Sequence, residues 1–440
     1  MPDTIHRDLQ NSDYLAWIDF LERSDPKSVD EVHAIEQLGF NSAYFRAIRD
    51  SATYRNLVQS TFGRVPMNDP ISLLKDLPFI NKDSFKTKLC DLTRETEGSE
   101  YVTTGGSTGV PFGFWRDRLA FSRELASKAH LYRQLGWREG DRQVVFRGLP
   151  IDTPSRQEFV EDLSELRLSS YYLTRDFTRT YITAINEYDP QWIRCYPSSL
   201  EVFCRNLPED VRFHNIRGIL CASENLYQPQ IDLFGTVFPN AQIYSHYGHY
   251  ELSALAGFCR YNYRYHVLPQ YGLVELIGET GLPVSKVGEV GEIVATSFLL
   301  DSTNFVRYRT GDLATFGGYG CPDCGRPTMM LDEIHGRKHL FLQSKKQRLV
   351  SLTALNMHNK VFEGVSRYQY IQSVPGLVTL RIVERPDHYA NLEHISSQIC
   401  SKLGDDFILS IEIVDDLERT HRGKHRALIQ NLEIAIGDQS

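Results

Sequence analysis

The sequence predicts an α/β protein, with a large N-terminal domain of α/β layers and a small α+β domain at the C-terminus. A chain of 440 residues is longer than the domains that a single hydrophobic core usually stabilises, so we expect two domains. Between residues 100 and 300, short continuous apolar segments alternate with helix-like stretches, which is typical of strands buried on both faces of a sheet. This pattern ends near Gly336-Arg337, so we place the domains at residues 1–336 and 337–440.

The elements of the large domain are predicted from local patterns. Residues 1 to about 90 are polar, with Pro and Asp interruptions, and we expect helices there. A strand of a more antiparallel region is expected at Gly291 to Leu300. The clearest strand candidates of the α/β region are Gln143–Phe146, Gly218–Cys221 and Ala241–Tyr244.

The C-terminal segment has its own set of elements. Strand candidates at Val378–Val383 and Phe407–Val414 flank a helix candidate at Asn391–Leu403. A basic loop, residues 419–426, and a last strand follow. About a hundred residues are enough for a domain that folds by itself.

Composition excludes several classes of protein. The chain has 48 basic and 56 acidic residues, and its net charge of −8 gives no general attraction to nucleic acid or to an anionic membrane. No apolar run approaches the roughly 18 residues of a membrane span, and the N-terminus has no signal-peptide pattern. Eight cysteines are too few for a disulfide scaffold, so we expect a cytoplasmic protein with reduced thiols or a metal site.

The densest motif is a glycine-rich loop, Tyr101-Val102-Thr103-Thr104-Gly105-Gly106-Ser107-Thr108-Gly109-Val110-Pro111. Its glycines and hydroxyl residues offer hydrogen-bond donors and close access to the backbone, as a phosphate-binding loop requires. The segment also contains Gly105-x-Ser107-x-Gly109, the pattern of a hydrolase nucleophile elbow, which must run directly into a helix. Pro111 and a strand-like segment follow instead, so a serine hydrolase with Ser107 as nucleophile is the weaker alternative.

Five further motifs follow the loop along the chain. They are Ala222-Ser223-Glu224-Asn225-Leu226, His246-Tyr247-Gly248-His249-Tyr250-Glu251, Tyr308-Arg309-Thr310-Gly311-Asp312, Gly336-Arg337 and Arg419-Thr420-x-x-Gly423-Lys424. With the loop, they resemble in order the motifs of the adenylate-forming superfamily, which includes acyl-CoA synthetases, luciferases and peptide-synthetase adenylation domains. The sequence is most similar to the phenylacetate–CoA ligase branch, especially members labelled as capsular polysaccharide biosynthesis proteins.

The resemblance implies an ATP-dependent ligase with a mobile C-terminal domain. Such an enzyme joins a small-molecule carboxylic acid to AMP, releases pyrophosphate, and passes the acyl group to coenzyme A or to an amine. Lys424 would bridge the carboxylate and the α-phosphate, Glu251 would hold Mg²⁺, and Arg337 would contact the ribose side. The implied ATP-binding residues are Thr104, Gly105, Gly106, Ser107, Thr108, Gly109, Ser223, Glu224, Asn225, Tyr247, Gly248, Asp312 and Arg337.

Three departures from the family pattern leave a second alternative open. Val110 stands where many members have a lysine, and Tyr250 stands where the family has Thr or Ser. The hinge, Gly336 to Leu340, lacks the usual acidic pair. A non-catalytic, zinc-stabilised binding protein of the same fold therefore remains a competing hypothesis.

The cysteines predict a structural zinc site. Cys321-Pro322-Asp323-Cys324 is a Cys-x-x-Cys turn flanked by glycines, without the helix that a thioredoxin motif opens. A structural zinc ion needs four ligands, and Cys259 with His266 is the best second pair. The branch that the sequence resembles also includes zinc-bearing members with this arrangement. The remaining cysteines are expected to be core thiols: Cys90, Cys195, Cys204, Cys221 and Cys400.

The acid is expected to bind where the Phe146-Arg147 strand end, the Tyr196-Pro197-Ser198 segment and the Ser245–Glu251 loop meet. Aromatic residues in these segments favour a planar or apolar acid. The residues predicted to line the pocket are Phe146, Arg147, Tyr196, Ser198, His246 and His249.

Overall fold

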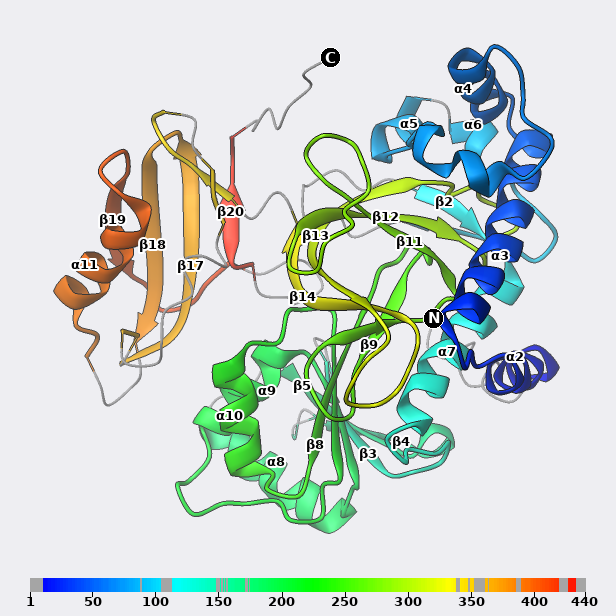
Figure 1. Cartoon of the computed structure of the whole chain (residues 1–440). Helices are drawn as coiled ribbons and strands as arrows, with labels where there is room; N and C mark the ends of the chain where they lie inside the picture. The colour runs from blue at the N-terminus through cyan, green and yellow to red at the C-terminus, as the bar shows by residue number, and fades with distance from the viewer. Residues whose placement is uncertain are drawn as a thin grey trace.

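The fold class predicted from the sequence is confirmed by the computed structural model, in which a large mixed α/β part and a smaller part with its own sheet lie side by side (Figure 1). The structure describes residues 11–432, apart from 88, 104–112, 148–150, 152, 154, 156, 171–172, 174, 338–340, 347–348, 352–360, 363, 385–388 and 419–425. Across these described residues, no helix is both long and apolar enough to cross a membrane.

Helices dominate the described residues up to about 90, as predicted. They are α2 (Ser12–Arg23), α3 (Val29–Asp50), α4 (Ala52–Phe62), the 3-10 helix η1 (Pro70–Asp76), α5 (Lys82–Thr87) and α6 (Leu89–Leu92). Side-chain caps begin the first two of these, because Asn11 accepts a hydrogen bond from the backbone N–H of Tyr14 and Ser28 from that of Glu31. A short hairpin of β1 (Glu100–Thr103) and β2 (Gly113–Arg116) follows and holds the two ends of the glycine-rich loop together.

A twelve-stranded sheet is the framework of the large part. Its strands are β3 (Gln143–Arg147), β4 (Gln157–Val160), β5 (Glu165–Ser169), β6 (Trp192–Cys195), β7 (Gly218–Ala222), β8 (Gln242–Gly248), β9 (Leu255–Phe258), β10 (Tyr265–Val267), β11 (Gly272–Ile277), β12 (Val290–Ser297), β13 (Tyr308–Tyr319) and β14 (Met329–Arg337). They lie in the order β11-β12-β13-β14-β10-β9-β8-β7-β6-β3-β5-β4. Strands β5, β3, β6, β7 and β8 pair in parallel, and the other pairs are antiparallel, so the predicted change to an antiparallel region at β12 is confirmed.

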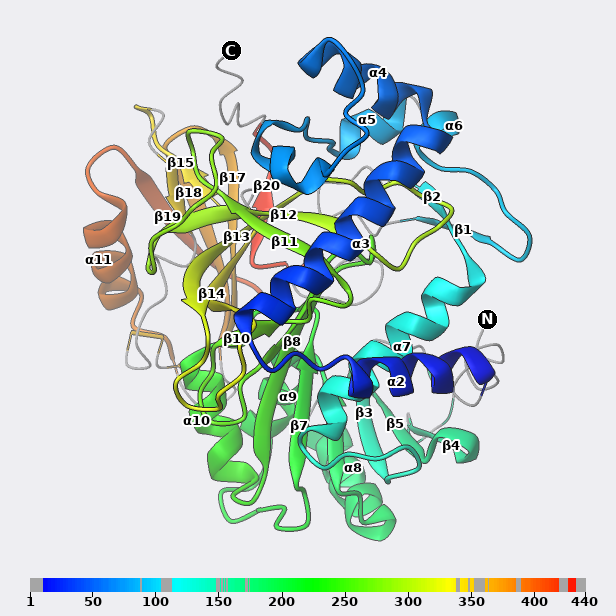
Figure 2. The ribbon, with the colours of Figure 1, turned by 45° about the vertical axis from the view of Figure 1, so that its right-hand side comes forward.

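Helices cover both faces of the parallel strands. Helix α7 (Arg118–Arg133) lies against one face, while α8 (Arg175–Tyr188), α9 (Pro197–Arg205) and α10 (Gln228–Val237) lie against the other (Figure 1). Ile219 and Leu220 are both buried and belong to the cores on opposite faces of β7. This double burial explains why the strands were continuously apolar in the sequence. The long α3 crosses the face of β11 and β12 (Figure 2).

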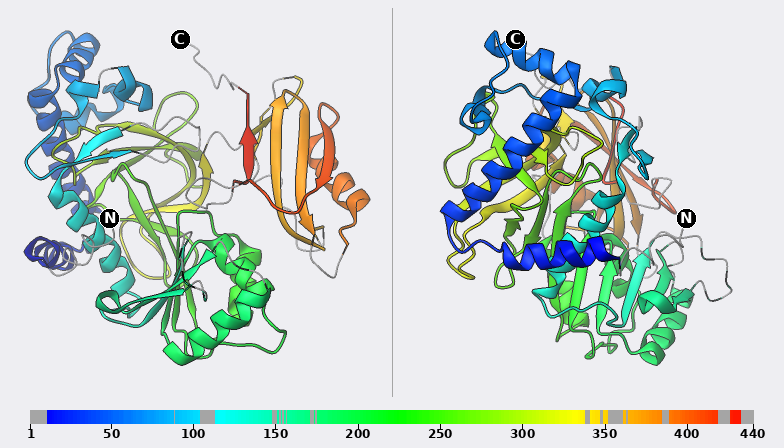
Figure 3. Two further views of the ribbon diagram at one scale, coloured as in Figure 1. Left: turned by 180° about the vertical axis from the view of Figure 1, so that it is seen from behind. Right: turned by 90° about the vertical axis from the view of Figure 1, so that its right-hand side faces the viewer.

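The C-terminal part has its own core, which includes Leu342, Leu380 and Ile399. Its elements are β15 (Phe341–Gln343), β16 (Leu349–Ser351), β17 (Val365–Val374), β18 (Leu377–Glu384), α11 (Leu392–Leu403), β19 (Ile408–Ile413) and β20 (Leu428–Gln430). The four-stranded sheet has the order β19-β18-β17-β20, and β20 lies on the side that faces the large part (Figures 1 and 3). The boundary at residues 336 and 337 stays a prediction.

The prediction for Cys400 was wrong. This thiol is exposed, because α11 directs Ile395, Ile399 and Leu403 into the core and Cys400 follows Ile399 by one position. Cys195, Cys204 and Cys221 are buried as predicted, whereas the side chain of Cys90 lies outside the described residues.

Candidate active site and metal cluster

The predicted ribose motif, Tyr308 to Asp312, which resembles the ribose-binding motif of the superfamily, brings two strands together around a buried carboxylate. The Tyr247 hydroxyl at the end of β8 donates a hydrogen bond of 2.7 Å to Oδ2 of Asp312 on β13. Asp312 is only 9% exposed, and the register of β13 with β14 places Arg337 directly opposite it. Burial, with the Asp312 charge, raises the pKa of Tyr247 well above its usual value. The hydroxyl therefore stays a donor and holds the carboxylate in one orientation.

Local sequence explains the bend that presents Asp312. Gly311 has a φ of +79°, a left-handed conformation that a side chain disfavours. The Thr310 hydroxyl donates to the carbonyl oxygen of Ile293 at 2.7 Å, and the backbone N–H of Gly311 donates to Glu292 at 3.2 Å. These contacts to β12 fix the irregular part of β13 next to the carboxylate.

A second buried carboxylate, Glu251, lies just beyond β8. Its Oε1 accepts a hydrogen bond of 3.1 Å from the Tyr308 hydroxyl, and its Oε2 lies 3.2 Å from Nδ1 of His249. Burial raises the pKa of Glu251, but the hydrogen bond and charge of His249, together with the charge of Lys82, lower it to about 2. Glu251 is therefore an anion at neutral pH, as a ligand of a hard cation must be.

The glycine-rich loop itself, with Thr104 to Gly109 and Val110, lies outside the described residues. Its flanking hairpin is described, and it lies beside the Glu251 segment. The Tyr250 ring packs edge-on against Phe114 of β2 at a centroid distance of 6.5 Å, and the Arg116 guanidinium lies 5.5 Å from the same ring. The departure at Tyr250 thus has a packing role against the hairpin.

The predicted ATP-binding residues Ser223 to Asn225, which resemble the segment that packs on adenine in the superfamily, follow β7 as a tight turn. Ser223 has a φ of +69°, and the Asn225 side-chain amide donates to the carbonyl oxygen of Ile334 on β14 at 3.1 Å. This bond anchors the turn to the strand that ends at Arg337. Gly248, the last residue of β8, is exposed.

The residues predicted to line the acid pocket divide into two groups. His246 is buried on β8, and its Nδ1 lies 3.2 Å from the Tyr132 hydroxyl on α7. Burial, with the cations of Lys128 and Arg194, lowers the pKa of His246 to about 3, so its ring is neutral. Phe146, in contrast, is fully buried in the core beneath α9, and we leave it out of the acid site.

The other predicted pocket residues lie at the ends of neighbouring elements. Arg147 is the last residue of β3, Tyr196 is the N-cap of α9, and Ser198 lies in the first turn of that helix. The side chains of Arg147 and Ser198 lie outside the described residues, as does that of Arg337. His249 contacts Glu251 and lies 3.3 Å from the Ser253 hydroxyl.

The four residues predicted to bind zinc converge. The potential ligand atoms of Cys259, His266, Cys321 and Cys324 all lie within 4.8 Å of one another. The Cys259 and Cys321 sulfurs are 4.0 Å apart, and Sγ of Cys324 lies 3.5 Å from Nε2 of His266. A tetrahedral zinc site with Zn–S near 2.3 Å and Zn–N near 2.0 Å has ligand–ligand edges of about 3.5 to 3.8 Å.

The surroundings of the cluster also fit a metal. Nδ1 of His266 lies 3.3 Å from the Thr328 hydroxyl, which fixes the ring and leaves Nε2 directed at the thiols. Burial, with Arg326, lowers the pKa of His266 to about 4, so the imidazole is neutral as a ligand must be. Burial, with the neighbouring thiols, raises the pKa of Cys324 to about 12. Burial opposes the ionisation of Cys321 as well, but hydrogen bonds from the backbone of Cys324 and Asp323 lower its pKa below the usual value, so Cys321 is the thiol that ionises more readily.

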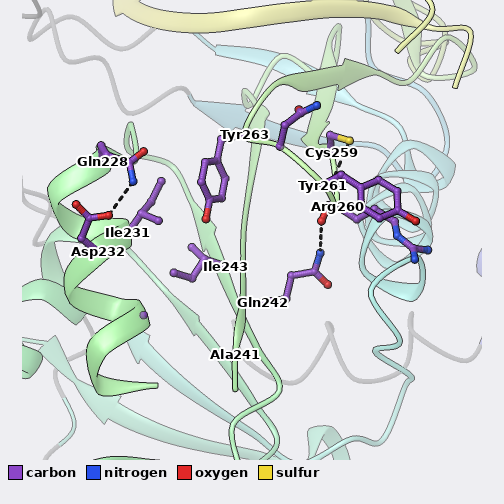
Figure 4. A pocket seen from close by; sticks show the side chains of 12 residues that line it. Gln228, Ile231, Asp232, Ala241, Gln242, Ile243, Cys259, Arg260, Tyr261 and Tyr263 are labelled. Carbon is purple, nitrogen blue, oxygen red and sulfur yellow. Dashed lines mark hydrogen bonds between the residues drawn. The ribbon is translucent and has the colours of Figure 1, made fainter. Parts of the chain in front are cut away.

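A cavity of about 420 Å³ lies next to this cluster (Figure 4). It is bounded by α10, the start of β8 and the loop after β9, where the Gln242 side chain donates to the carbonyl oxygen of Arg260 at 3.0 Å. Of its lining residues, Cys259 is the one that belongs to the predicted sites. The cavity therefore adds nothing to the nucleotide or acid site.

Several contacts of the site were missed in the sequence. Tyr308 binds Glu251 across 57 positions, and Tyr132 binds His246 across 114. Tyr308 belongs to the predicted ribose motif, but no local pattern in the sequence shows that its hydroxyl contacts Glu251. Lys424 and the alternative nucleophile Ser107 both lie outside the described residues.

Comparison with known proteins gives matches in sequence and in fold. Residues 342–431 match the CapK C-terminal domain family. Protein CapK of Staphylococcus aureus is 22% identical over 378 residues, which cover 82% of this chain and 81% of that protein. The structure is also similar to a crystal structure of 2-hydroxyisobutyryl-CoA ligase in the postadenylation state, in complex with R3-HIB-AMP. The match has a TM-score of 0.72 at 15% sequence identity and covers 93% of this chain and 91% of the ligase chain. The chain has the adenylate-forming fold.

A second structural match has a different acceptor chemistry. The acyl acid amido synthetase AtGH3.15, in complex with 2,4-DB, has a TM-score of 0.54 at 13% identity and covers 91% of this chain and 89% of its own. The resemblance of this chain to the superfamily is therefore confirmed at the level of the fold. The C-terminal match and the CapK relative agree with the predicted capsular branch.

Proposed function

We propose that this chain is an ATP-dependent acid ligase. One observation carries the proposal: two buried carboxylates, Asp312 and Glu251, are held by the hydroxyls of Tyr247 and Tyr308 beside the hairpin of the glycine-rich loop. A buried carboxylate is costly unless hydrogen-bond donors or cations offset its charge. A nucleotide with its divalent cation supplies hydroxyl donors for one carboxylate and positive charge for the other.

The first half-reaction would form an acyl-adenylate. A carboxylate oxygen of the acid attacks the α-phosphorus of ATP, the bond to the bridging oxygen breaks, and pyrophosphate leaves with that electron pair. Asp312 would accept hydrogen bonds from the ribose hydroxyls, and Arg337 would contact the same side. Glu251 would hold Mg²⁺, and Ser223 to Asn225 would pack on adenine. Ser107 and the other loop residues would bind the β- and γ-phosphates.

The C-terminal domain would complete the site as a mobile lid. Lys424 lies in the segment that leads into β20, and β20 is on the side of the small domain that faces the large one (Figure 3). As a point charge on a flexible stem, Lys424 suits the bridging of the acid and the α-phosphate. The acid would lie near His246, His249 and Tyr196, with coenzyme A or an amine as acceptor.

We also propose that Cys259, His266, Cys321 and Cys324 hold one structural zinc ion. The edge distances, the Thr328 contact and the neutral imidazole support this ligand set. Four protein ligands leave no open position, so the ion would stabilise the fold and would not activate water.

ATP–pyrophosphate exchange over a library of small carboxylic acids tests the ligase proposal. A ligase gives exchange that needs a particular acid and Mg²⁺. A binding protein of the same fold gives ATP binding without exchange with any acid, and a serine hydrolase gives labelling of Ser107 by a fluorophosphonate probe.

A further inference from the structure

A free sheet edge lies on the outer side of the small domain. Strand β19 is at one end of the four-stranded sheet and β20 is at the other. β20 lies on the side of the large part, whereas β19 and α11 lie on the side turned away from it (Figures 1 and 3). Among the described residues, no strand pairs with the outer side of β19. The large part therefore leaves this edge open to another molecule.

This edge lacks the features that usually protect an edge strand from pairing. Residues 408–413 contain no proline, and their register with β18 has no bulge. The one charged side chain, Glu412, is bound by Arg381 of β18 at 3.0 Å. Ile408 and Ile413 are 54% and 53% exposed. An unprotected edge with exposed isoleucines favours the addition of a further strand.

The backbone of β19 shows which groups an added strand would meet. The N–H of Ile408 donates to the carbonyl oxygen of Gly376 at 2.7 Å, and that of Val414 donates to the carbonyl oxygen of Ile382 at 2.9 Å. Successive residues of a strand direct their backbone groups to opposite edges, so the even-numbered residues bond to β18. The odd-numbered residues direct their N–H and C=O groups outward: Leu409, Ile411 and Ile413.

A groove beside the edge follows the same odd-numbered residues. It has a volume of about 500 Å³, and Leu409 and Ile411 form its strand side. Its helix side is formed by four residues of α11: Leu392, Glu393, Ser396 and Ser397. The two serines have small side chains, so the groove has room for apolar side chains that enter from the free edge.

The sequence of the edge is symmetric in polarity about Ile411. Residues 408–414 are Ile-Leu-Ser-Ile-Glu-Ile-Val, with one polar residue on each side of the central isoleucine and two apolar residues at each end. A two-fold axis through Ile411, perpendicular to the sheet, pairs this strand with an antiparallel copy of itself. The cross-strand pairs are then Ile411–Ile411, Leu409–Ile413, Ser410–Glu412 and Ile408–Val414. Each pair joins two apolar or two polar side chains, and no like charges lie opposite each other.

We propose that two copies of this chain pair through β19, antiparallel about a two-fold axis at Ile411, and join their four-stranded sheets into one continuous sheet. The outward backbone groups of the odd-numbered residues exchange hydrogen bonds, and their side chains fill the groove beside α11 of the other copy. The pairing leaves β20 turned to the large part of its own chain, and it is independent of the proposed ligase activity. One strand and one helix of each copy make a small interface, so the dissociation constant is expected in the micromolar range.

Analytical ultracentrifugation of the full chain tests the pairing with two lysine variants. Ile413→Lys places a charge opposite Leu409 of the other copy, and its matched control is Val374→Lys. The two side chains are 53% and 50% exposed, so neither change should disturb the folded chain, and Val374 ends β17, two strands away from β19. We expect the wild type and the control to form dimers with equal affinity, and Ile413→Lys to raise the dissociation constant about tenfold or more. A wild type that stays monomeric at roughly 200 µM, or equal affinity in all three proteins, overturns the proposal.

Cysteine crosslinking tests the register. Ser410 and Glu412 of the other copy are predicted to form a non-hydrogen-bonded pair, whose Cβ atoms lie about 4.5–5.5 Å apart, close to the spacing of a disulfide. Ser410→Cys and Glu412→Cys are each made with Cys400→Ser, because Cys400 is exposed. On mild oxidation, a mixture of the two variants should give a disulfide-linked dimer in higher yield than either variant alone. Equal yields, or no crosslink in the mixture, refute the axis at Ile411.

Discussion

Asp312→Asn is the substitution that tests the nucleotide site most directly. Asparagine has the same shape as aspartate, but it is neutral, and one of its two oxygens is replaced by an –NH₂ donor. The Tyr247 hydroxyl, now 2.7 Å from Oδ2 of Asp312, can keep an oxygen acceptor in the variant. The orientation of the side chain and the fold should therefore survive, while the acceptor for the ribose hydroxyls is weakened.

The size of the effect follows from the bonds that are lost. Hydrogen bonds to a charged acceptor contribute about 1.5–3 kcal/mol each. In the variant, the –NH₂ group of asparagine faces a ribose hydroxyl that previously donated to a carboxylate oxygen, so this hydrogen bond is lost or weakened. We expect ATP binding to weaken by about 3 kcal/mol, which corresponds to about 100-fold in Kd. Isothermal titration of Mg-ATP into the wild type and the variant measures this difference.

The matched control is Asp332→Asn on the adjacent strand β14. The Asp332 carboxylate lies 3.3 Å from Arg264, away from Tyr247, so its loss should leave ATP affinity unchanged. Equal affinity in wild type and Asp312→Asn, or equal loss in both variants, would refute the assignment of Asp312 to the ribose.

Three more predictions concern the proposed metal ions and Lys424. Protein purified without added metal should contain one zinc ion per chain by elemental analysis. Cys321→Ser should lower both the zinc content and the melting temperature. The control Cys204→Ser removes a buried thiol elsewhere and should retain zinc. A metal-free wild type with freely titrating thiols would exclude the site. Lys424→Ala should keep its melting temperature and lose pyrophosphate exchange at least 100-fold, so a loss of only a few-fold would assign the charge to another residue. Glu251→Gln should raise the Mg²⁺ concentration needed for half-maximal exchange about tenfold or more, and an unchanged Mg²⁺ dependence would remove Glu251 from the metal site.

The parts of the fold that sequence predicted well are those whose signal is local. The parallel strands were continuously apolar because two helical layers bury them, and β18, α11 and β19 appear within about one residue of their predicted ends. Cys400 shows the limit of that reasoning: its neighbours along the chain are apolar, but only the helical period decides which of them face the core.

The candidate site was predictable to the extent that its residues form short motifs. Asp312, Glu251 and Tyr247 could be named from such motifs, and Cys321-x-x-Cys324 is a turn that prepares two ligands by itself. The pairings between motifs could not be predicted, because the Tyr247–Asp312 contact joins residues 65 positions apart through the order of strands in the sheet. No pattern in one sequence reports that order.

The proposed zinc ion and Asp312 lie at opposite ends of one hairpin. Asp312 pairs with Arg337 at the open end of β13 and β14, while Cys321 and Cys324 lie in the turn that joins them, about 30 Å away at the usual rise of a strand. The register of these strands shifts at three places between the two ends. A slip of one residue would turn the Asp312 side chain to the other face of the sheet. Zinc bound to the turn, and through Cys259 and His266 to β9 and β10, would oppose such a slip. Removal of zinc by a chelator should therefore weaken ATP binding although no ligand of the ion touches the nucleotide, and ATP affinity that is unchanged after complete zinc loss would show that the strands keep their register without it.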